Sequence, residues 1–137
     1  MANAVEREPD PNGWLPSDDE GLVLVESTSE AGGEGLRIGV VLKPNSDLGA
    51  HWNNDAGPTQ LWVAAPEGWA LGQRLHAIPN PATDVSDEPR RFELEVGRLG
   101  GGGGGTVLRG YAVYFVCEGE TGVCMSRRQN VEVTLPG

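Results

Sequence analysis

The chain has 137 residues and a formal net charge of −10, from 20 acidic against 10 basic side chains. This length suits one domain, and a hydrophobic share of 38% excludes disorder of the whole chain. The negative charge disfavours nucleic acid and anionic membrane surfaces as partners, because both are polyanions. No run of residues is long and apolar enough for a transmembrane helix, so we expect no membrane insertion by this chain.

Residues 1–20 are polar and rich in proline, and they end in the acidic run Asp18-Asp19-Glu20. This composition predicts a flexible or loosely docked N-terminal arm in front of a single domain at residues 21–137. The arm has no apolar segment of the kind that a signal peptide needs. We therefore expect either a cytoplasmic protein or a mature domain with an added Met1.

Segments typical of β-strands follow the arm, with turn signals at intervals of about ten residues. In the clearest of them, Phe92, Leu94 and Val96 alternate with charged side chains, as in a strand with one buried face. No window carries a helical stripe. The pattern predicts a single immunoglobulin-like antiparallel β-sandwich. Strands are expected at 21–26, 36–42, 60–64, 73–78, 91–96, 106–117 and 131–135, and loops at 27–35 and 44–58.

The same alternation predicts which side chains form the interior. If this register is right, Glu93, Glu95 and Glu132 lie at the surface, because they occupy the intervening positions. The predicted interior consists of Leu36, Ile38, Val40, Leu61, Val63, Phe92, Leu94, Val96, Val113, Phe115, Val131 and Val133.

Six consecutive glycines, Gly100 to Gly105, separate two of the predicted strands. They predict a flexible hairpin loop. A phosphate-binding loop is disfavoured, because no helix follows and the Lys and Ser/Thr of a P-loop are missing.

The two cysteines of the chain, Cys117 and Cys124, stand on either side of a short acidic loop. A hairpin of this length brings the Cα atoms within the disulfide range of about 4.4–6.8 Å. Closing the ring would stabilise the fold by about 2.5 kcal/mol in the chain-entropy model. The carboxylates of the loop disfavour an activated thiolate. The spacing leaves three alternatives open: a structural disulfide, a redox-active pair or two free thiols.

A metal site is not expected. The two histidines, His51 and His76, are distant in sequence from each other and from the cysteines, and no spacing typical of zinc ligands occurs.

The polar segment 44–58 holds His51, Trp52, Asn53 and Asp55. A polar loop that carries an aromatic side chain is typical of a binding surface. The alternative is that Trp52 packs into the interior while the Asn and Asp side chains form Asx-turns. A conventional hydrolase is disfavoured, because neither a Ser–His–Asp arrangement nor a distinct pair of acids stands out.

A series of short motifs extends over residues 20–136. In order they are LKP (42–44), HWN (51–53), DAGPT (55–59), PEGW (66–69), IPNP (78–81), YFVC (114–117) and GVC (122–124). This series resembles the N-terminal sandwich domain of the thiol:disulfide interchange reductases, the DsbD-like family. It also resembles the related sandwich domain attached to thioredoxin-like and NHL-repeat proteins. The chain departs from the family after Cys124, where Met125-Ser126-Arg127-Arg128 replaces an aromatic residue and prolines, and in a cysteine spacing that is one residue longer.

The resemblance implies a function that the spacing alone does not. Cys117 and Cys124 would be the redox pair of a thiol–disulfide exchange module, with Cys117 attacking the client. The module would pass reducing equivalents from a thioredoxin-like protein to an oxidised client protein, without a metal or organic cofactor. The resemblance also implies an extracytoplasmic location. His51, Trp52, Asn53 and Asp55 would then shield the pair or guide a partner.

An alternative function belongs to another class. The chain would then be a non-catalytic accessory or protein-interaction sandwich, and the cysteines would form a structural disulfide. The reduction potential discriminates between the two, because structural disulfides usually lie below about −300 mV.

Overall fold

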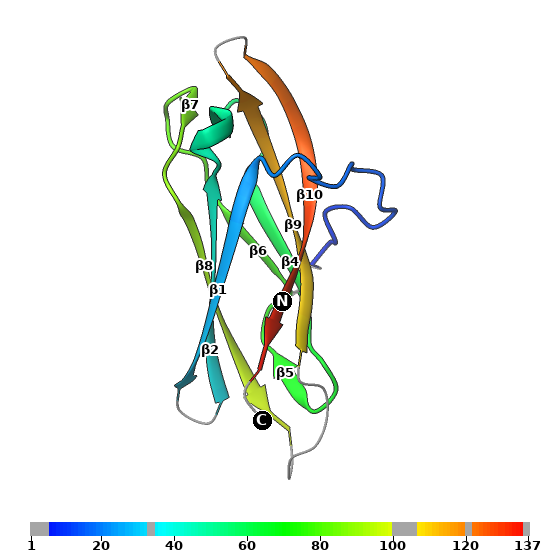
Figure 1. Cartoon of the computed structure of the whole chain (residues 1–137). Coiled ribbons are helices and arrows are strands. Elements are labelled where there is room, and N and C mark those ends of the chain that lie inside the picture. Colours follow the sequence, from blue (N-terminus) through cyan, green and yellow to red (C-terminus); the bar gives the residue numbers. More distant parts are fainter. Residues whose placement is uncertain (1–5, 33–34, 100–106, 120–121, 136–137) are drawn as a thin grey trace.

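The computed structural model describes residues 6–32, 35–99, 107–119 and 122–135. They form two β-sheets built from antiparallel ladders and packed against each other, which confirms the predicted all-β sandwich (Figure 1). The predicted hairpin loop at Gly100–Gly105 lies outside the described residues. In the part of the chain that the structure describes, no helix is long and apolar enough to cross a membrane.

The two sheets differ in size. The smaller sheet has the order β1-β2-β8-β5 and contains β1 (Val23–Gly32), β2 (Gly35–Pro44), β8 (Arg90–Arg98) and β5 (Trp69–Leu71). The larger has the order β6-β4-β9-β3-β7, with β10 also beside β9. Its strands are β6 (Leu75–Ile78), β4 (Thr59–Ala64), β9 (Val107–Glu118), β3 (Ala50–Asn53), β7 (Val85–Ser86) and β10 (Val123–Thr134). A short 3-10 helix, η1 (Ser46–Leu48), precedes β3.

Strand β9 is the centre of the larger sheet. It pairs with β10 along its whole length, and with β4 and then β3 along its other edge. Val113, for example, stands opposite Arg128 on one side and Gln60 on the other. The prediction of a central strand at 106–117 is therefore confirmed for its described residues.

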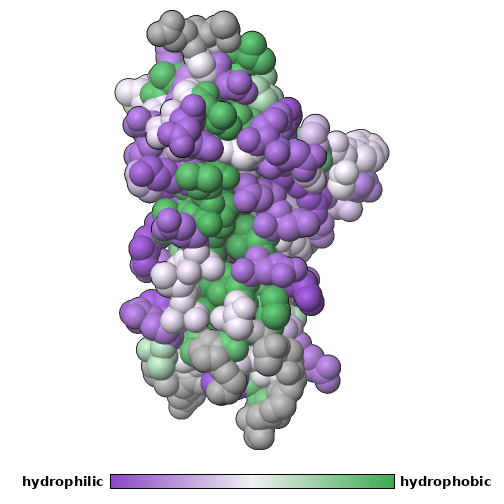
Figure 2. All heavy atoms as spheres, in the orientation of Figure 1, coloured by the Kyte–Doolittle hydropathy of each residue, from purple (hydrophilic) through white to green (hydrophobic). Residues whose placement is uncertain are grey.

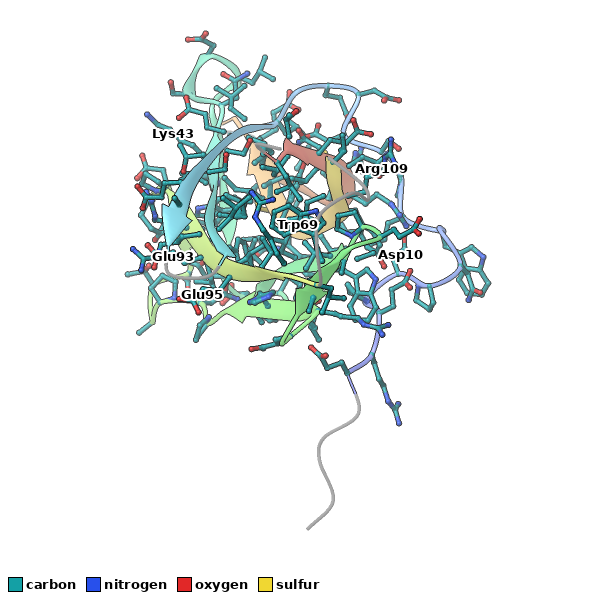
Figure 3. The ribbon with its side chains drawn as sticks, turned by 90° about the horizontal axis from the view of Figure 1, so that it is seen from below. Asp10, Lys43, Trp69, Glu93, Glu95 and Arg109 are labelled. Atoms are coloured by element: carbon teal, nitrogen blue, oxygen red, sulfur yellow. A yellow bond between two sulfur atoms is a disulfide. The ribbon has the colours of Figure 1, made fainter. Side chains whose placement is uncertain are left out.

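The core lies between the sheets and is built mainly from the predicted alternating positions. Ile38, Val40 and Leu61 are fully buried, and Glu93, Glu95 and Glu132 are exposed, which confirms the register. Figure 3 looks along the strands and shows Glu93 and Glu95 on the outside, with Trp69 in the interior. On one side the sheets meet through β1 and β10, where Figure 2 shows a band of hydrophobic atoms between hydrophilic margins.

The face predicted for two core residues of β9 is wrong. The side chains that β9 contributes to the main core are Leu108, Ala112, Tyr114 and Val116, so Val113 and Phe115 lie on the outer face of the sheet. Val113 is buried on that face, whereas Phe115 is only half-buried. Because β9 is apolar on both faces, alternation alone does not reveal which face meets the other sheet.

Two predicted loops contain strands. Residues 27–32 continue β1 and pair with β2, and the predicted loop 44–58 contains η1 and β3. The first of these strands is polar because β1 is an edge strand, and its Glu30 lies 3.8 Å from Arg37 of β2. The second is short and takes its partner, β9, from far along the chain.

The described part of the N-terminal arm lies beside β10 (Figure 1). None of its apolar side chains belongs to the core cluster, and Trp14 is 83% exposed. Carboxylates hold it instead: Asp10 is buried and accepts a hydrogen bond of 2.8 Å from Arg128. Glu20 accepts one of 2.7 Å from Arg127.

Asp18 ties the arm to the sandwich at a second point. Its carboxylate accepts hydrogen bonds from the backbone N–H groups of Leu22 and Val23 and one of 2.6 Å from the Tyr114 hydroxyl. Burial raises the pKa of Tyr114, so this hydroxyl keeps its proton and donates a hydrogen bond to the carboxylate. The arm is therefore docked by polar contacts rather than by apolar packing.

We expect acid to release the arm before it unfolds the sandwich. Burial raises the pKa of Asp10, but hydrogen bonds from Arg128 and the backbone outweigh this and lower it; the Arg127 hydrogen bond lowers the pKa of Glu20. Their stabilisation is complete above about pH 5 and is lost as the pH falls through the lowered values. In wild type, hydrogen exchange should show residues 6–20 losing protection in acid. In Asp10→Asn, the same residues should lose protection already at pH 7. Equal protection of wild type and variant would contradict this.

Candidate functional site

Cys117 and Cys124 form a disulfide, with Cα atoms 3.9 Å apart. The prediction that they lie close enough to bond is therefore confirmed. They stand directly opposite each other in the β9–β10 hairpin. The bond thus links neighbouring strands of one sheet and closes only a short ring.

His51 of β3 lies opposite Cys117 on the strand on its other side, so that His51, Cys117 and Cys124 form a row across three adjacent strands. His51 pairs with Cys117, and Cys117 pairs with Cys124. Side chains of directly opposite residues in antiparallel strands lie on the same face. Strand geometry therefore places the imidazole and both sulfur atoms together on the outer face, beyond the main core.

The two sulfur atoms differ in access. Cys117 is 3% exposed, because it lies between β3 and β10, whereas Cys124 is an exposed residue. Val123, beside Cys124, is 59% exposed. Any molecule that reaches this disulfide from solvent therefore meets Cys124 first.

Trp52 belongs to the next row and points the other way. It is fully buried, and its indole N–H donates a hydrogen bond of 2.7 Å to the carbonyl of Glu88. The interpretation of Trp52 as an interior packing residue is therefore confirmed. Asn53 and Asp55 form the Asx-turn foreseen as the alternative, with the Asp55 N–H bonded to the Asn53 side chain.

The loop between β3 and β4 lies against the face that carries the disulfide. Gly57 packs so closely on Phe115 that a Cβ atom there would approach a ring carbon to 3.0 Å. Phe115 precedes Cys117 by two residues and shares its face. The amide of Asn80 fixes the loop by donating to the carbonyls of Asn54, Ala56 and Gly57. The loop thus covers part of the surface next to the sulfur atoms.

Arg90, which the sequence analysis did not single out, holds this loop from inside. It is 4% exposed and donates hydrogen bonds to Thr59, Asn80 and Asn54 at 2.8, 3.0 and 2.7 Å. Its guanidinium lies 4.6 Å from the centre of the Trp52 ring. Burial lowers the pKa of Arg90, which Glu88 opposes. The alternation of β8 offered a signal, because Arg90 shares the inward face with Phe92.

The candidate site is not an enclosed cavity. A groove of about 1020 Å³ lies along β8 and is lined by Glu93, Glu95, Arg37 and His76 among others, but by neither cysteine nor His51. Among the described residues, Cys124 is exposed at the surface outside this groove, which suits a macromolecular partner better than a small enclosed substrate.

No family model and no curated protein matches this chain. The resemblance to the DsbD-like family therefore remains an expectation. The functional argument rests on the geometry around Cys117 and Cys124.

We predict that Arg90→Met lowers the free energy of unfolding by about 1–3 kcal/mol, because it leaves the buried Thr59 hydroxyl and the half-buried Asn54 and Asn80 amide oxygens without their donor. The measurement is urea unfolding followed by tryptophan fluorescence. Arg91→Met is the matched control: Arg91 is exposed and forms an ion pair with Glu93, which is also exposed, so its change should stay within about 0.5 kcal/mol. Equal losses in the two variants would contradict the role of Arg90.

Proposed function

We propose that this protein is a thiol–disulfide exchange module that acts through the Cys117–Cys124 pair. The observation that carries the proposal is the pairing of an exposed sulfur, Cys124, with a buried one, Cys117, on an open face. An exchange reaction needs an accessible sulfur for in-line attack and a second sulfur that leaves. This arrangement supports both requirements in one bond.

The proposed reaction begins with a partner thiolate that attacks the Sγ of Cys124. The partner–Cys124 bond forms, the Cys117–Cys124 bond breaks, and its electron pair stays on Cys117, which takes up a proton. A second thiol of the partner then attacks the mixed disulfide and releases reduced Cys124. In total the partner dithiol loses two electrons and two protons and becomes a disulfide, and the cysteine pair gains them. Transfer to an oxidised client is the same sequence in reverse.

This scheme gives Cys124 the contact with both partners. The resemblance implied instead that Cys117 attacks the client. Exposure favours Cys124, because an attack by buried Cys117 would require the hairpin to separate from β3.

His51 fits the chemistry of the leaving sulfur. It pairs with Cys117 and is partly exposed, and its Nδ1 lies 3.3 Å from the Gly49 carbonyl. A charged imidazole next to a developing thiolate stabilises it. His51 thus supports departure of Cys117, while the acidic composition of the chain opposes thiolate formation.

Opening the bond leaves the fold intact in this proposal. The ring contributes only about 2.5 kcal/mol by chain entropy, whereas β9 keeps its ladders with β10, β4 and β3. The partners that fit are those implied by the resemblance: a thioredoxin-like protein as donor and an oxidised client protein as acceptor. An extracytoplasmic location is part of the same proposal.

A structural disulfide is the second candidate. It is favoured by the burial of Cys117 and by the position of the bond inside a long ladder. The protein would then be an accessory or interaction sandwich whose hairpin the bond reinforces.

The first test equilibrates the full chain with glutathione and dithiol buffers of defined potential. We expect half-reduction above about −300 mV, with unchanged far-UV circular dichroism. Cys117→Ser should trap a mixed disulfide with a thioredoxin-fold protein through exposed Cys124, and Cys124→Ser should not. Resistance to reduction at that potential, together with no trapping by either variant, would establish the structural role instead.

The second test concerns His51. In Cys124→Ser the lone thiol of Cys117 can be titrated through its thiolate absorbance. Adding His51→Gln should raise the pKa of Cys117, because it removes the imidazole that stands beside this sulfur and can stabilise its thiolate. His76→Gln is the control, since His76 lies on β6 beyond β4 and should leave the titration unchanged. Identical titrations with and without His51 would exclude its role.

A further inference from the structure

We propose that the client protein docks as an extended segment on the open edge of β10, beside Cys124, and so adds a strand to the larger sheet. This inference rests on the proposed function and names the surface and the kind of partner that it uses. The argument begins with the hydrogen bonds of Arg128, a residue of the same strand.

The backbone of Arg128 faces away from β9. Its N–H donates to the carbonyl of Pro16 and its carbonyl accepts from the N–H of Asp18, both at 2.9 Å. The arm thus forms a parallel bridge to this edge, with Ser17 opposite Arg128. The edge of β10 therefore already accepts an extended segment at one position.

Every second residue of β10 directs its backbone groups to the same edge as Arg128. In a β-strand the N–H and C=O of one residue point to the same edge, and the edge alternates from residue to residue. β10 pairs with β9 residue by residue from Val123 to Thr134 without a bulge. Ser126 and Cys124, two and four residues before Arg128, therefore direct their backbone groups to the same outer edge.

Most of these groups remain available to a partner. Among the described residues, the Ser126 carbonyl already accepts a hydrogen bond of 2.9 Å from the Arg127 guanidinium, whereas the N–H groups of Ser126 and Cys124 and the Cys124 carbonyl have no such bond there. The arm crosses β10 partway along its length, and among the described residues no strand lies on the outer edge of the stretch toward the β9–β10 turn (Figure 1). An unpaired edge of this kind is a template for strand addition.

The arm itself cannot occupy this stretch in the observed structure. Pro16 has no N–H to donate, and the N–H groups of Trp14 and Leu15 bond the Asp10 carboxylate. The chain thus turns away from β10 just before the positions opposite Ser126 and Cys124. This stretch of the edge is therefore left for another segment to pair with.

Strand addition would deliver a cysteine to the right place. In an antiparallel addition, the residue opposite Cys124 would form a hydrogen-bonded pair with it, at a Cα separation of about 5.5 Å. Its side chain would lie on the same outer face as the Cys124 sulfur. That separation lies within the disulfide range of about 4.4–6.8 Å. The edge thus aligns the client's sulfur with that of Cys124.

The negative charge of this protein determines which extended segments can bind at the edge. The arm brings Asp18 to Arg128 and pairs Glu20 with Arg127 of β10, and the chain as a whole carries a net charge of −10. An acidic segment would be repelled. The partner segment is therefore extended, carries a cysteine, and is neutral or basic.

The test measures second-order rates at which reduced peptides open the disulfide of the full chain. The probe is acetyl-Lys-Thr-Val-Cys-Thr-Val-Lys-amide, with one backbone nitrogen methylated at a time; glutathione is the reference reductant. Methylation two residues from the cysteine should slow the reaction by about tenfold, because it removes a pairing hydrogen bond. Methylation one residue away should have no effect. A profile without this alternation would overturn edge docking.

A pair of variants tests the same edge from the protein side. Ser126→Pro removes an edge N–H, and proline is tolerated on edge strands; Ser126→Ala keeps the N–H. We expect the proline variant to lose about fivefold in peptide rate, with an unchanged glutathione rate, and the alanine variant to match wild type. Equal peptide rates in both variants would overturn the proposal, and the methylated peptides decide the matter should the proline variant not fold. If neither glutathione nor peptide opens the wild-type bond, the proposed function fails instead.

Discussion

The pairing of β9 on both edges is the constraint on which the rest of the site depends. β3 and β4 hold one edge and β10 the other, so the backbone that carries Cys117 is fixed from both sides. Cys124 lies on β10, whose outer edge the described arm pairs only at Arg128. A single disulfide therefore joins a sulfur in a rigid, buried setting to one in an open setting. The order of the strands produces this asymmetry without any special loop.

The apolar outer face of β9 explains why the sandwich has an arm and a covering loop. Tyr111, Val113 and Cys117 are buried there although the opposite sheet does not reach them. Arg128 stacks on the Tyr111 ring at 3.7 Å, and Asp10 of the arm bonds both Arg128 and the Tyr111 hydroxyl. The β3–β4 loop covers Phe115 in a similar way. Polar segments thus shield a second apolar surface and leave Cys124 open at its end.

The sequence allowed prediction of what depends on local pattern. Alternation in β2 and β8 identified inward side chains such as Ile38 and Leu94, and the short hairpin brought the cysteines together. The sequence did not allow prediction of features that depend on pairing between distant segments. β3 is short and pairs with β9 and β7, both distant in sequence, and the acceptors of Arg90 come from segments far along the chain. The face of Phe115 was misjudged for the same reason, because the alternation of β9 fits either face.

In the proposed exchange, charge around the pair bears on the direction of electron flow. A disulfide is a strong oxidant when its reduced form is stabilised. A low thiol pKa stabilises the reduced form, because it favours the thiolate. The carboxylates of this chain act in the opposite sense, because they disfavour thiolate at the hairpin. That favours giving electrons to a client over taking them. His51 opposes the carboxylates at one sulfur only, since it pairs with Cys117 and not with Cys124. His51 thereby favours departure of the Cys117 sulfur without making the whole pair strongly oxidising. This combination suits a module that receives electrons and passes them to a client.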